Sequence, residues 1–329
     1  MIQESTSNSG ALTESDLPPL HVAADRDATR AQKRFFGLLR AELTLLAVGA
    51  MVGLFAVLPA VLPFIPVFKT EPFALTGFSI PALPYADLAS AILIASALIL
   101  RLWRFRAHPE DHWYEARAVA ESTKSVAWRY AVGGRPFDVS KDQAAVDTLA
   151  RERFHETLTV TQSYRPDARA AEEEQITPAM RAVRAQSAEA RRETYRIGRI
   201  EDQRAWYERK AELNRTLARR AHLAIIGLEL LAVIAALLQA LRIVPENTQA
   251  VLTALIGGGI AWTQARRYQD LSASYRLTAQ EARKLEESYH KLEGAFQQDP
   301  SDATWAQFVD SAEEAFSREH NMWIATRDV

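Results

Sequence analysis

The chain has 329 residues, a formal net charge of −2 and no cysteine. The absence of cysteine excludes disulfides and thiolate metal sites, and the near-neutral charge argues against nucleic acid as a partner. The mean hydropathy of −0.16 resembles that of a soluble protein, but it averages strongly apolar stretches with highly charged helical sequence.

Residues 1–29 are predicted to form a disordered N-terminal tail. The segment is rich in Ser, Thr, Asp and Glu, so it has little apolar surface to bury.

Four apolar stretches follow the tail in two closely spaced pairs. About 20 residues of helix cross the hydrocarbon core of a bilayer, and each stretch reaches roughly that length. A soluble all-α core could explain one such run but hardly four. The predicted fold is therefore an all-α membrane protein with four transmembrane helices in two hairpins, at 43–68, 83–103, 221–241 and 247–265.

The basic residues predict the orientation of these spans. The four segments that flank the hairpins on the side of the termini carry 5, 4, 6 and 4 Lys and Arg residues, 19 in all, whereas the two hairpin turns carry only Lys69 and Arg242. Basic residues favour the cytosolic side of a membrane. We therefore expect a multi-pass protein of the bacterial inner membrane, with both termini and the middle of the chain in the cytosol.

Long cytosolic helices with coiled-coil-like stripes are predicted after each hairpin. Apolar or small residues recur there at alternating spacings of three and four, which is the pattern of a helical seam. The stripe after the first hairpin ends at Gly133. The stripe after the second hairpin is interrupted by the segment 299–302, and a last helix follows that can fold back on the preceding one. The stripes are Trp113, Ala116, Ala120, Thr123, Ala127 and Tyr130; Tyr268, Leu271, Tyr275, Thr278, Ala282, Leu285, Tyr289, Leu292 and Phe296; and, in the last helix, Trp305, Phe308, Ala312, Phe316 and Trp323.

Each half of the chain thus contains a membrane hairpin followed by a seamed helix. This repeat predicts a first unit over 30–166, a polar linker over 167–178 and a second unit over 179–329. Because no proline occurs between Met180 and the third span, one helix is expected to run from Met180 into the membrane.

Two segments carry a family resemblance. The run YRIGRIEDQRAWYERKAELN at 195–214, just before a hairpin, resembles the signature of SLATT domains, and the run from Trp113 to Tyr130 is similar to a second subtype of that superfamily. The residues that carry the resemblance are Trp113, Arg117, Glu121, Lys124, Trp128, Arg199, Asp202, Gln203, Trp206, Tyr207, Lys210 and Trp323.

The resemblance implies a two-span effector domain of bacterial conflict systems, associated with SMODS and SLOG sensor proteins. It implies a pore-forming or membrane-disrupting role, triggered by a partner that senses or makes a nucleotide signal. The lipid bilayer and further copies of the chain are the other expected partners. A membrane-anchored coiled-coil scaffold that does not conduct is the alternative.

No enzymatic activity is expected. The cytosolic sequence contains no P-loop, nucleophile elbow, HExxH motif or dinucleotide fingerprint, so we assign no catalytic residue and no cofactor. His108, Glu110, Asp111 and His112 cluster near a helix start, but an ordinary first turn explains them better than a metal site.

Two carboxylates are candidate pore residues. Glu229 lies inside the third span, where a carboxylate is costly and usually faces a bundle interior or an aqueous path. Glu42 occupies a similar place in the first span, although Arg40 nearby favours the membrane interface. A protonated or hydrogen-bonded packing role is the alternative for Glu229.

Glycines within the spans predict close helix packing. Gly49 and Gly53 form a GxxxG pair, and Gly257, Gly258 and Gly259 lie together in the fourth span. Small residues let helix backbones approach each other in a membrane. The triple glycine could also provide a flexible point, but packing is the favoured interpretation.

Overall fold

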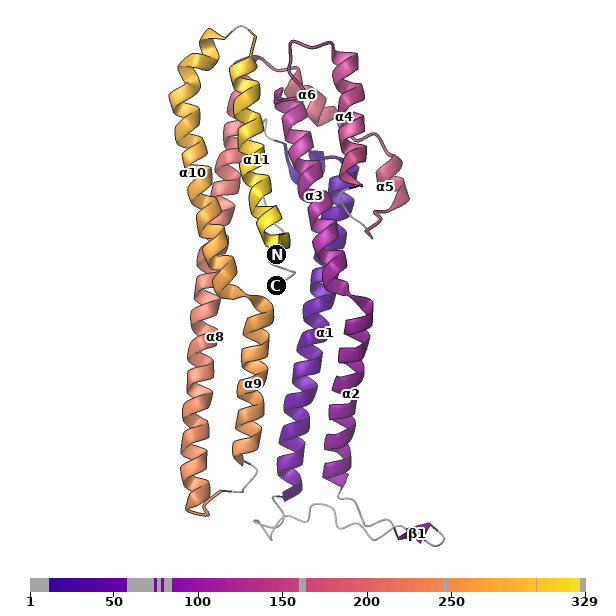
Figure 1. The fold of residues 1–329 in the computed structure, drawn as a ribbon, viewed down its shortest axis with the longest axis vertical. Helices are drawn as coiled ribbons and strands as arrows, with labels where there is room; N and C mark the ends of the chain where they lie inside the picture. The colour runs from indigo at the N-terminus through magenta and orange to yellow at the C-terminus, as the bar shows by residue number, and fades with distance from the viewer. Residues whose placement is uncertain are drawn as a thin grey trace. The chain divides into compact units, whose positions relative to one another are not determined.

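The structure is a computed structural model that describes residues 12–57, 74–75, 78–79, 85–159, 164–244, 248–299 and 301–325. Within these ranges the protein is all-helical, apart from a two-residue antiparallel ladder between β1 (Ala74–Leu75) and β2 (Phe78–Ser79). In chain order the helices are η1 (Glu14–Asp16), α1 (Pro19–Val57), α2 (Tyr85–Ala107), α3 (Pro109–Val132), α4 (Gln143–Thr157), α5 (Ala168–Glu172), α6 (Pro178–Arg184), α7 (Ala188–Tyr195), the π-helix η3 (Arg196–Glu201), α8 (Asp202–Ala240), α9 (Thr248–Arg266), α10 (Tyr268–Gln298) and α11 (Ala303–Ala325) (Figure 1).

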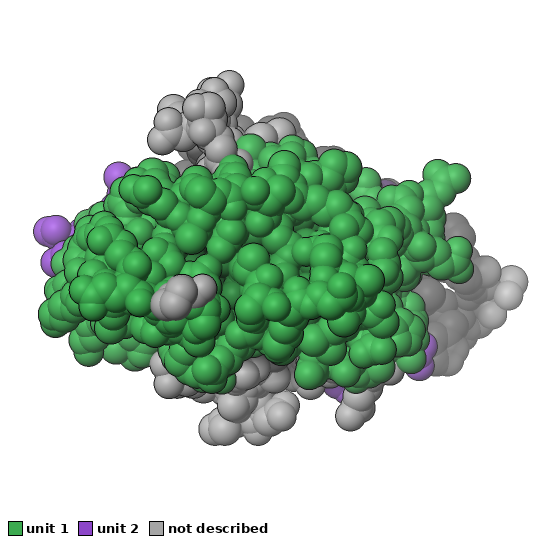
Figure 2. All heavy atoms as spheres, turned by 90° about the horizontal axis from the view of Figure 1, so that it is seen from above, with its two compact units in different colours: residues 1–32, 109–213, 271–329 green, residues 33–108, 214–270 purple. Residues whose placement is uncertain are grey.

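The chain divides into two compact units, and each unit draws on both halves of the sequence. Unit 1 comprises residues 1–32, 109–213 and 271–329, and unit 2 comprises residues 33–108 and 214–270 (Figure 2). Unit 1 holds the charged helices, and unit 2 holds most of the apolar sequence.

The core of unit 1 forms around α3. Five residues of the predicted stripe, Ala116, Ala120, Thr123, Ala127 and Tyr130, are buried, and the sixth, Trp113, is half-buried. The helix ends where expected: Gly133 adopts a φ of +78°, a conformation that strains residues with a Cβ.

The last two helices pack as a hairpin, as predicted (Figure 1). The ring of Phe296 on α10 lies 5.4 Å from the ring of Trp305 and 5.6 Å from that of Phe308, both on α11. Ala312 and Phe316 continue the buried face of α11. The described part of the structure does not include the side chain of Trp323.

The α10 stripe is buried only in part. Thr278, Ala282, Tyr289 and Phe296 are buried, but Leu292 remains 36% exposed. Leu292 therefore lies at an open edge of the hairpin, although the spacing predicted it within the seam.

The prediction of a disordered tail over 1–29 is wrong for the part that the structure describes. Leu17, Leu20 and Ala24 are buried, and α1 begins at Pro19. Apolar residues recur every three or four positions here, which makes an amphipathic helix that the polar average of the segment conceals. Residues 1–11 lie outside the described ranges.

The long helix before the third span is shorter than predicted. It begins at Ala188 rather than Met180, because α6 ends at Arg184 and the Ser187 hydroxyl caps a new helix by accepting from the Ala190 amide at 3.3 Å. From there the helix continues to Ala240 through η3. The predicted linker 167–178 contains α5 and holds the buried residues Gln175 and Ile176.

Among the described residues, three helical stretches are long and apolar enough to cross a membrane: Pro19–Leu54, Tyr85–Val132 and Ala188–Ala240. They cover 43–54 of the first predicted span, 85–103 of the second and 221–240 of the third; residues 58–68 and 83–84 lie outside the described ranges. The fourth predicted span corresponds to α9, whose polar Thr248 and Gln249 and three glycines lower its apolar character.

In unit 2, α1 and α2 approach closely at two glycines. A Cβ on Gly49 would lie 3.2 Å from Ile94 Cγ1, and one on Gly53 would lie 3.3 Å from Ser90 Oγ. The Ser90 hydroxyl donates to the Gly49 carbonyl at 2.8 Å. In contrast, a Cβ on Gly257 or Gly258 would meet nothing within 4 Å, and one on Gly259 would meet only Ile225, at 3.4 Å and beyond.

Replacing these glycines should separate packing positions from open ones. We expect Gly49→Val to destabilise the α1–α2 hairpin by about 1–3 kcal/mol, because the side chain overpacks against Ile94. Gly257→Val serves as the matched control in another apolar helix and should leave the thermal unfolding midpoint in detergent nearly unchanged. Equal midpoints for the two variants would contradict the described packing.

Candidate functional site

Residues of the two signature segments meet inside unit 1. Trp128 on α3, from the first segment, is 1% exposed. Its ring contacts that of Tyr195 edge to face, with centroids 5.9 Å apart, and Tyr195 contacts Trp305 in the same way at 5.7 Å. Three segments distant in sequence thus share one aromatic core, and Tyr195 lies directly before the π-helix.

A buried ion pair lies beside this core. Arg199 donates from Nε to Glu313 Oε1 at 2.9 Å and from Nη2 to Oε2 at 2.7 Å, and the Tyr195 hydroxyl donates to Oε1 at 2.9 Å. The side chains of Arg199 and Glu313 are 3% and 0% exposed. Burial, followed by the charge of Glu313, raises the pKa of Tyr195 well above its usual value, so its hydroxyl stays a donor.

The π-helix contributes to this arrangement. Arg199 lies within η3, and its guanidinium carbon is 5.0 Å from the centre of the Phe316 ring on α11. A π-helical turn carries one residue more than an α-helical turn and occurs frequently at functional sites. The pair therefore attaches α11 to the base of the helix that continues into the third predicted span.

A second charge cluster surrounds Arg117 on α3. Its Nη2 lies 2.6 Å from Glu121 Oε1, and its Nη1 lies 2.5 Å from Asp25 Oδ1 on α1. Burial alone would raise the pKa of Glu121, but the positive charges of Arg117, Lys124 and Arg199 outweigh it and hold that pKa at about 2. Glu121 is therefore ionised throughout the physiological range, and it links electrostatically to Arg199 in the other signature.

A salt bridge of Lys124 links the N-terminal segment to α3. Its Nζ lies 2.7 Å from Glu14 Oε1, and the other Glu14 oxygen lies 2.8 Å from His21 Nε2. The other His21 nitrogen, Nδ1, is 2.8 Å from the Ala120 carbonyl. Burial opposes ionisation of Glu14, but the His21 hydrogen bond and the Lys124 charge lower the pKa of this carboxyl overall.

The remaining signature residues lie mostly at a helix-packing surface. The Trp206 ring lies 5.6 Å from that of Tyr275 on α10, and Lys210 Nζ lies 5.4 Å from the Trp206 ring centre. Tyr207 is buried in the same cluster, whereas Asp202 is exposed. Of the other positions, Gln203 is half-buried, Trp113 is half-buried and stacks on Tyr114, and the Trp323 side chain lies outside the described atoms.

The two candidate pore carboxylates differ in their exposure and in their ion pairing. Glu42 is 5% exposed and pairs with Arg104 Nη2 at 2.9 Å, so its charge is neutralised between α1 and α2. Glu229 is exposed on α8. Within the single chain α8 turns this position outward, so the position of Glu229 in an assembly of several chains stays a prediction.

Sequence reasoning missed Glu313. The residue interrupts the apolar stripe of α11 between Val309 and Phe316, and a carboxylate at a core position was the available signal. Its partner Arg199 was recognised only as part of a signature, because no local pattern relates positions 114 residues apart.

Two family models match the chain. The model described as SMODS and SLOG-associating 2TM effector domain 3 matches residues 74–192, and the one described as SMODS and SLOG-associating 2TM effector domain 1 matches residues 195–323. The chain belongs to the SLATT superfamily and carries two of its domains in tandem. Comparison with curated proteins and with solved structures gives no match.

These matches identify membrane effector domains of conflict systems that are associated with sensor partners. Arg117 and Glu121 belong to the first SLATT domain, and Arg199 and Glu313 belong to the second. Each of these ion pairs therefore lies within one domain, and the ring contact between Trp128 and Tyr195 joins the two domains. The division of the chain into 30–166 and 179–329 stays a prediction.

The buried pair leads to a stability prediction. Glu313→Leu should destabilise the protein by about 3–5 kcal/mol, because Arg199 keeps a buried charge with no counter-ion. The pair of Arg196 and Glu193, whose side chains are 20% and 49% exposed, offers a control, and Glu193→Gln should change stability by less than about 1 kcal/mol.

Thermal unfolding of the purified protein in detergent measures both effects. Combining Arg199→Leu with Glu313→Leu should recover part of the loss, since neither charge then remains unpaired. A double variant that is no better than the sum of the two single variants would show that the pair does not act as a unit.

Proposed function

We propose that this tandem SLATT protein is a membrane effector that assembles into a homo-oligomeric pore when a nucleotide-sensing partner triggers it. The observation that carries the proposal is the pair of SLATT matches on a chain with three long apolar helices. The proposal assigns the protein no enzymatic activity, catalytic residue or cofactor.

The proposed fourth span is α9. Its 19 residues extend about 28 Å, close to the ~30 Å thickness of a hydrocarbon core. Ile225 on α8 lies within 3.4 Å of the position of a Cβ on Gly259, so α9 packs against the third span within unit 2. Four spans would place unit 2 in the bacterial inner membrane and unit 1, with its coiled-coil-like α10, in the cytosol.

Two exposed positions test this topology in a chain that has no cysteine of its own. Ile243 lies after α8 in the turn of the second hairpin and is 63% exposed, and Arg153 is exposed on α4 of unit 1. An impermeant maleimide added to spheroplasts should label Ile243→Cys but not Arg153→Cys, because basic flanks remain in the cytosol.

Lysis before labelling supplies the control, since both cysteines should then react. Labelling of Arg153→Cys in intact spheroplasts would overturn the proposed orientation.

The exposed position of Glu229 supports the proposal that several chains assemble. The carboxylate is exposed on α8 among apolar neighbours, with Leu230 61% and Val233 58% exposed. A charged side chain facing the centre of a bilayer costs about 2.5–3.5 kcal/mol on insertion scales. Contact with a water-filled path between copies of the chain would remove that cost. We therefore propose that Glu229 lines such a path.

Glu229→Gln tests the proposed lining position, because it keeps the shape and hydrogen-bonding capacity but removes the charge. In cells that express the chain with its neighbouring genes, we expect Glu229→Gln to reduce ion leakage or cation preference at unchanged oligomer size. Glu42→Gln is the matched control within the first hairpin, and it should affect stability more than selectivity. Full leakage by Glu229→Gln would assign Glu229 to packing.

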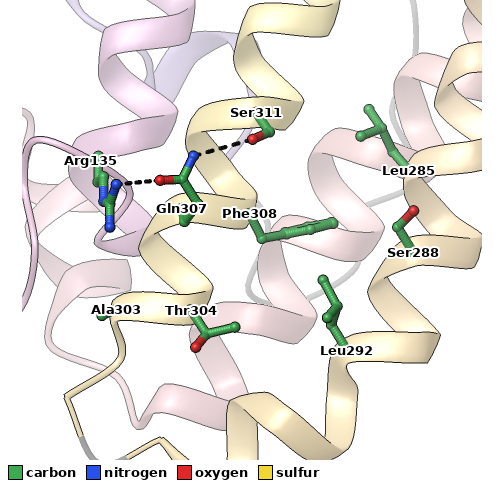
Figure 3. Close-up of a pocket in the computed structure, with 9 residues that line it drawn as sticks. All are labelled: Arg135, Leu285, Ser288, Leu292, Ala303, Thr304, Gln307, Phe308 and Ser311. Carbon is green, nitrogen blue, oxygen red and sulfur yellow. Dashed lines mark hydrogen bonds between the residues drawn. The ribbon is translucent and has the colours of Figure 1, made fainter.

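A groove in unit 1 favours the alternative of a non-conducting scaffold. Its volume is about 560 Å³, and Leu285, Leu292 and Phe308 line it together with polar side chains of α10 and α11 (Figure 3). Arg135 at its edge donates a hydrogen bond to Gln307. Such a surface suits a partner helix, and an intact membrane potential under triggering conditions would support this alternative.

A further inference from the structure

The end of unit 2 where α1 and α9 meet holds two arginines in a reciprocal arrangement. On α1, Phe36 precedes Arg40 by four residues, and on α9, Trp262 precedes Arg266 by four. The Arg266 guanidinium carbon lies 3.7 Å from the centre of the Phe36 ring, and that of Arg40 lies 5.5 Å from the centre of the Trp262 ring. Each cation therefore rests on an aromatic ring of the other helix.

The two guanidiniums share one aromatic partner. Arg266 also lies over its own helix's Trp262 at 4.9 Å, so both cations contact one indole ring. The Phe36 and Trp262 rings meet edge to face at 6.1 Å and form the floor between the helices. Two like charges gathered on one ring repel each other unless an anion joins them.

No carboxylate among the described residues supplies that anion. The acids at this end of unit 2 are Glu42, which pairs with Arg104, and Asp270, which pairs with Arg267 at 3.0 Å. The Arg266 Nε is buried and has no hydrogen-bond partner among the described atoms. A cation–π contact stabilises a cation by about 0.5–2 kcal/mol and leaves its N–H donors unsatisfied.

We propose that Arg40 and Arg266 form a phosphate site that binds the headgroup phosphate of an anionic phospholipid. Guanidinium groups match phosphate oxygens with paired N–H donors, and basic sites between membrane helices on the cytosolic side bind anionic headgroups. Arg40 is exposed and Arg266 is half-buried, so the site is open to a ligand at the membrane surface. The bound phosphate joins α1 to α9.

The site rests on the proposed placement of unit 2 in the bilayer, but it does not depend on pore formation. The neutral aromatic floor and the interhelical position distinguish it from a general basic surface. Arg101 and Arg106 on α2 provide the comparison, because they are exposed arginines of unit 2.

Native mass spectrometry of the full chain tests the proposal with vesicle-derived lipid. The protein is extracted from bilayers of phosphatidylcholine with or without phosphatidylglycerol, at matched ionic strength. We expect the wild-type protein to retain phosphatidylglycerol. In Arg40→Gln/Arg266→Gln the apparent affinity for phosphatidylglycerol should be about tenfold or more lower than in the wild type. Arg101→Gln/Arg106→Gln removes the same charge and should retain most of the binding.

If both double variants lose phosphatidylglycerol binding equally, the lipid binds a diffuse basic surface and the proposed site is wrong. Equal retention of phosphatidylcholine and phosphatidylglycerol by the wild type would also contradict the proposal. A separate arm adds inorganic phosphate to the detergent-solubilised protein. If phosphate alone stabilises the wild type as strongly as the lipid and Arg40→Gln/Arg266→Gln abolishes this effect, the ligand is a soluble phosphate and the lipid assignment fails. Ion leakage measured on the same variants reports on the pore separately.

Discussion

The buried contact between Arg199 and Glu313 is the constraint on which the organisation of unit 1 depends. Both charges leave water, so they are tolerated only while each remains the partner of the other and Tyr195 fills the remaining acceptor position. Burial of this pair requires α11 to lie against the π-helix, and the Phe296, Trp305 and Phe308 rings then hold α10 against α11.

This constraint explains how two repeated domains become interdependent. The two SLATT domains follow each other in the sequence, but the aromatic core of unit 1 combines Trp128 of the first domain with Tyr195 and Trp305 of the second. The charge of Arg199 likewise helps to keep Glu121 ionised. A trigger that displaced α11 would therefore unpair a charge at the base of the helix that also carries Glu229. Such a change suits the proposed effector, because one helix links the two positions.

The periodic features were predictable from the sequence, and the long-range pairings were not. The stripe of α3 and the α10–α11 hairpin follow from apolar spacing, since a helix buries residues three and four apart on one face. The tail prediction failed because composition conceals an amphipathic helix around Leu20. Glu313 was missed because its partner is determined by tertiary packing. Gly49 and Gly257 were both interpreted as packing positions because small residues let helices approach, yet of these two only Gly49 lies close to a neighbouring helix.

The outward positions of Gly257 and Glu229 bear on how the second hairpin is used. Within one chain, a glycine that approaches no neighbour gains nothing from its small size, and an exposed carboxylate gains nothing from its charge. Both features become useful when another helix approaches α8 and α9, because glycine permits close backbone contact and a carboxylate then borders a polar path instead of lipid. The first hairpin has its glycines and its buried acid already engaged by α2. In the proposed assembly the second hairpin would therefore supply the contact surface, with the proposed pore along α8.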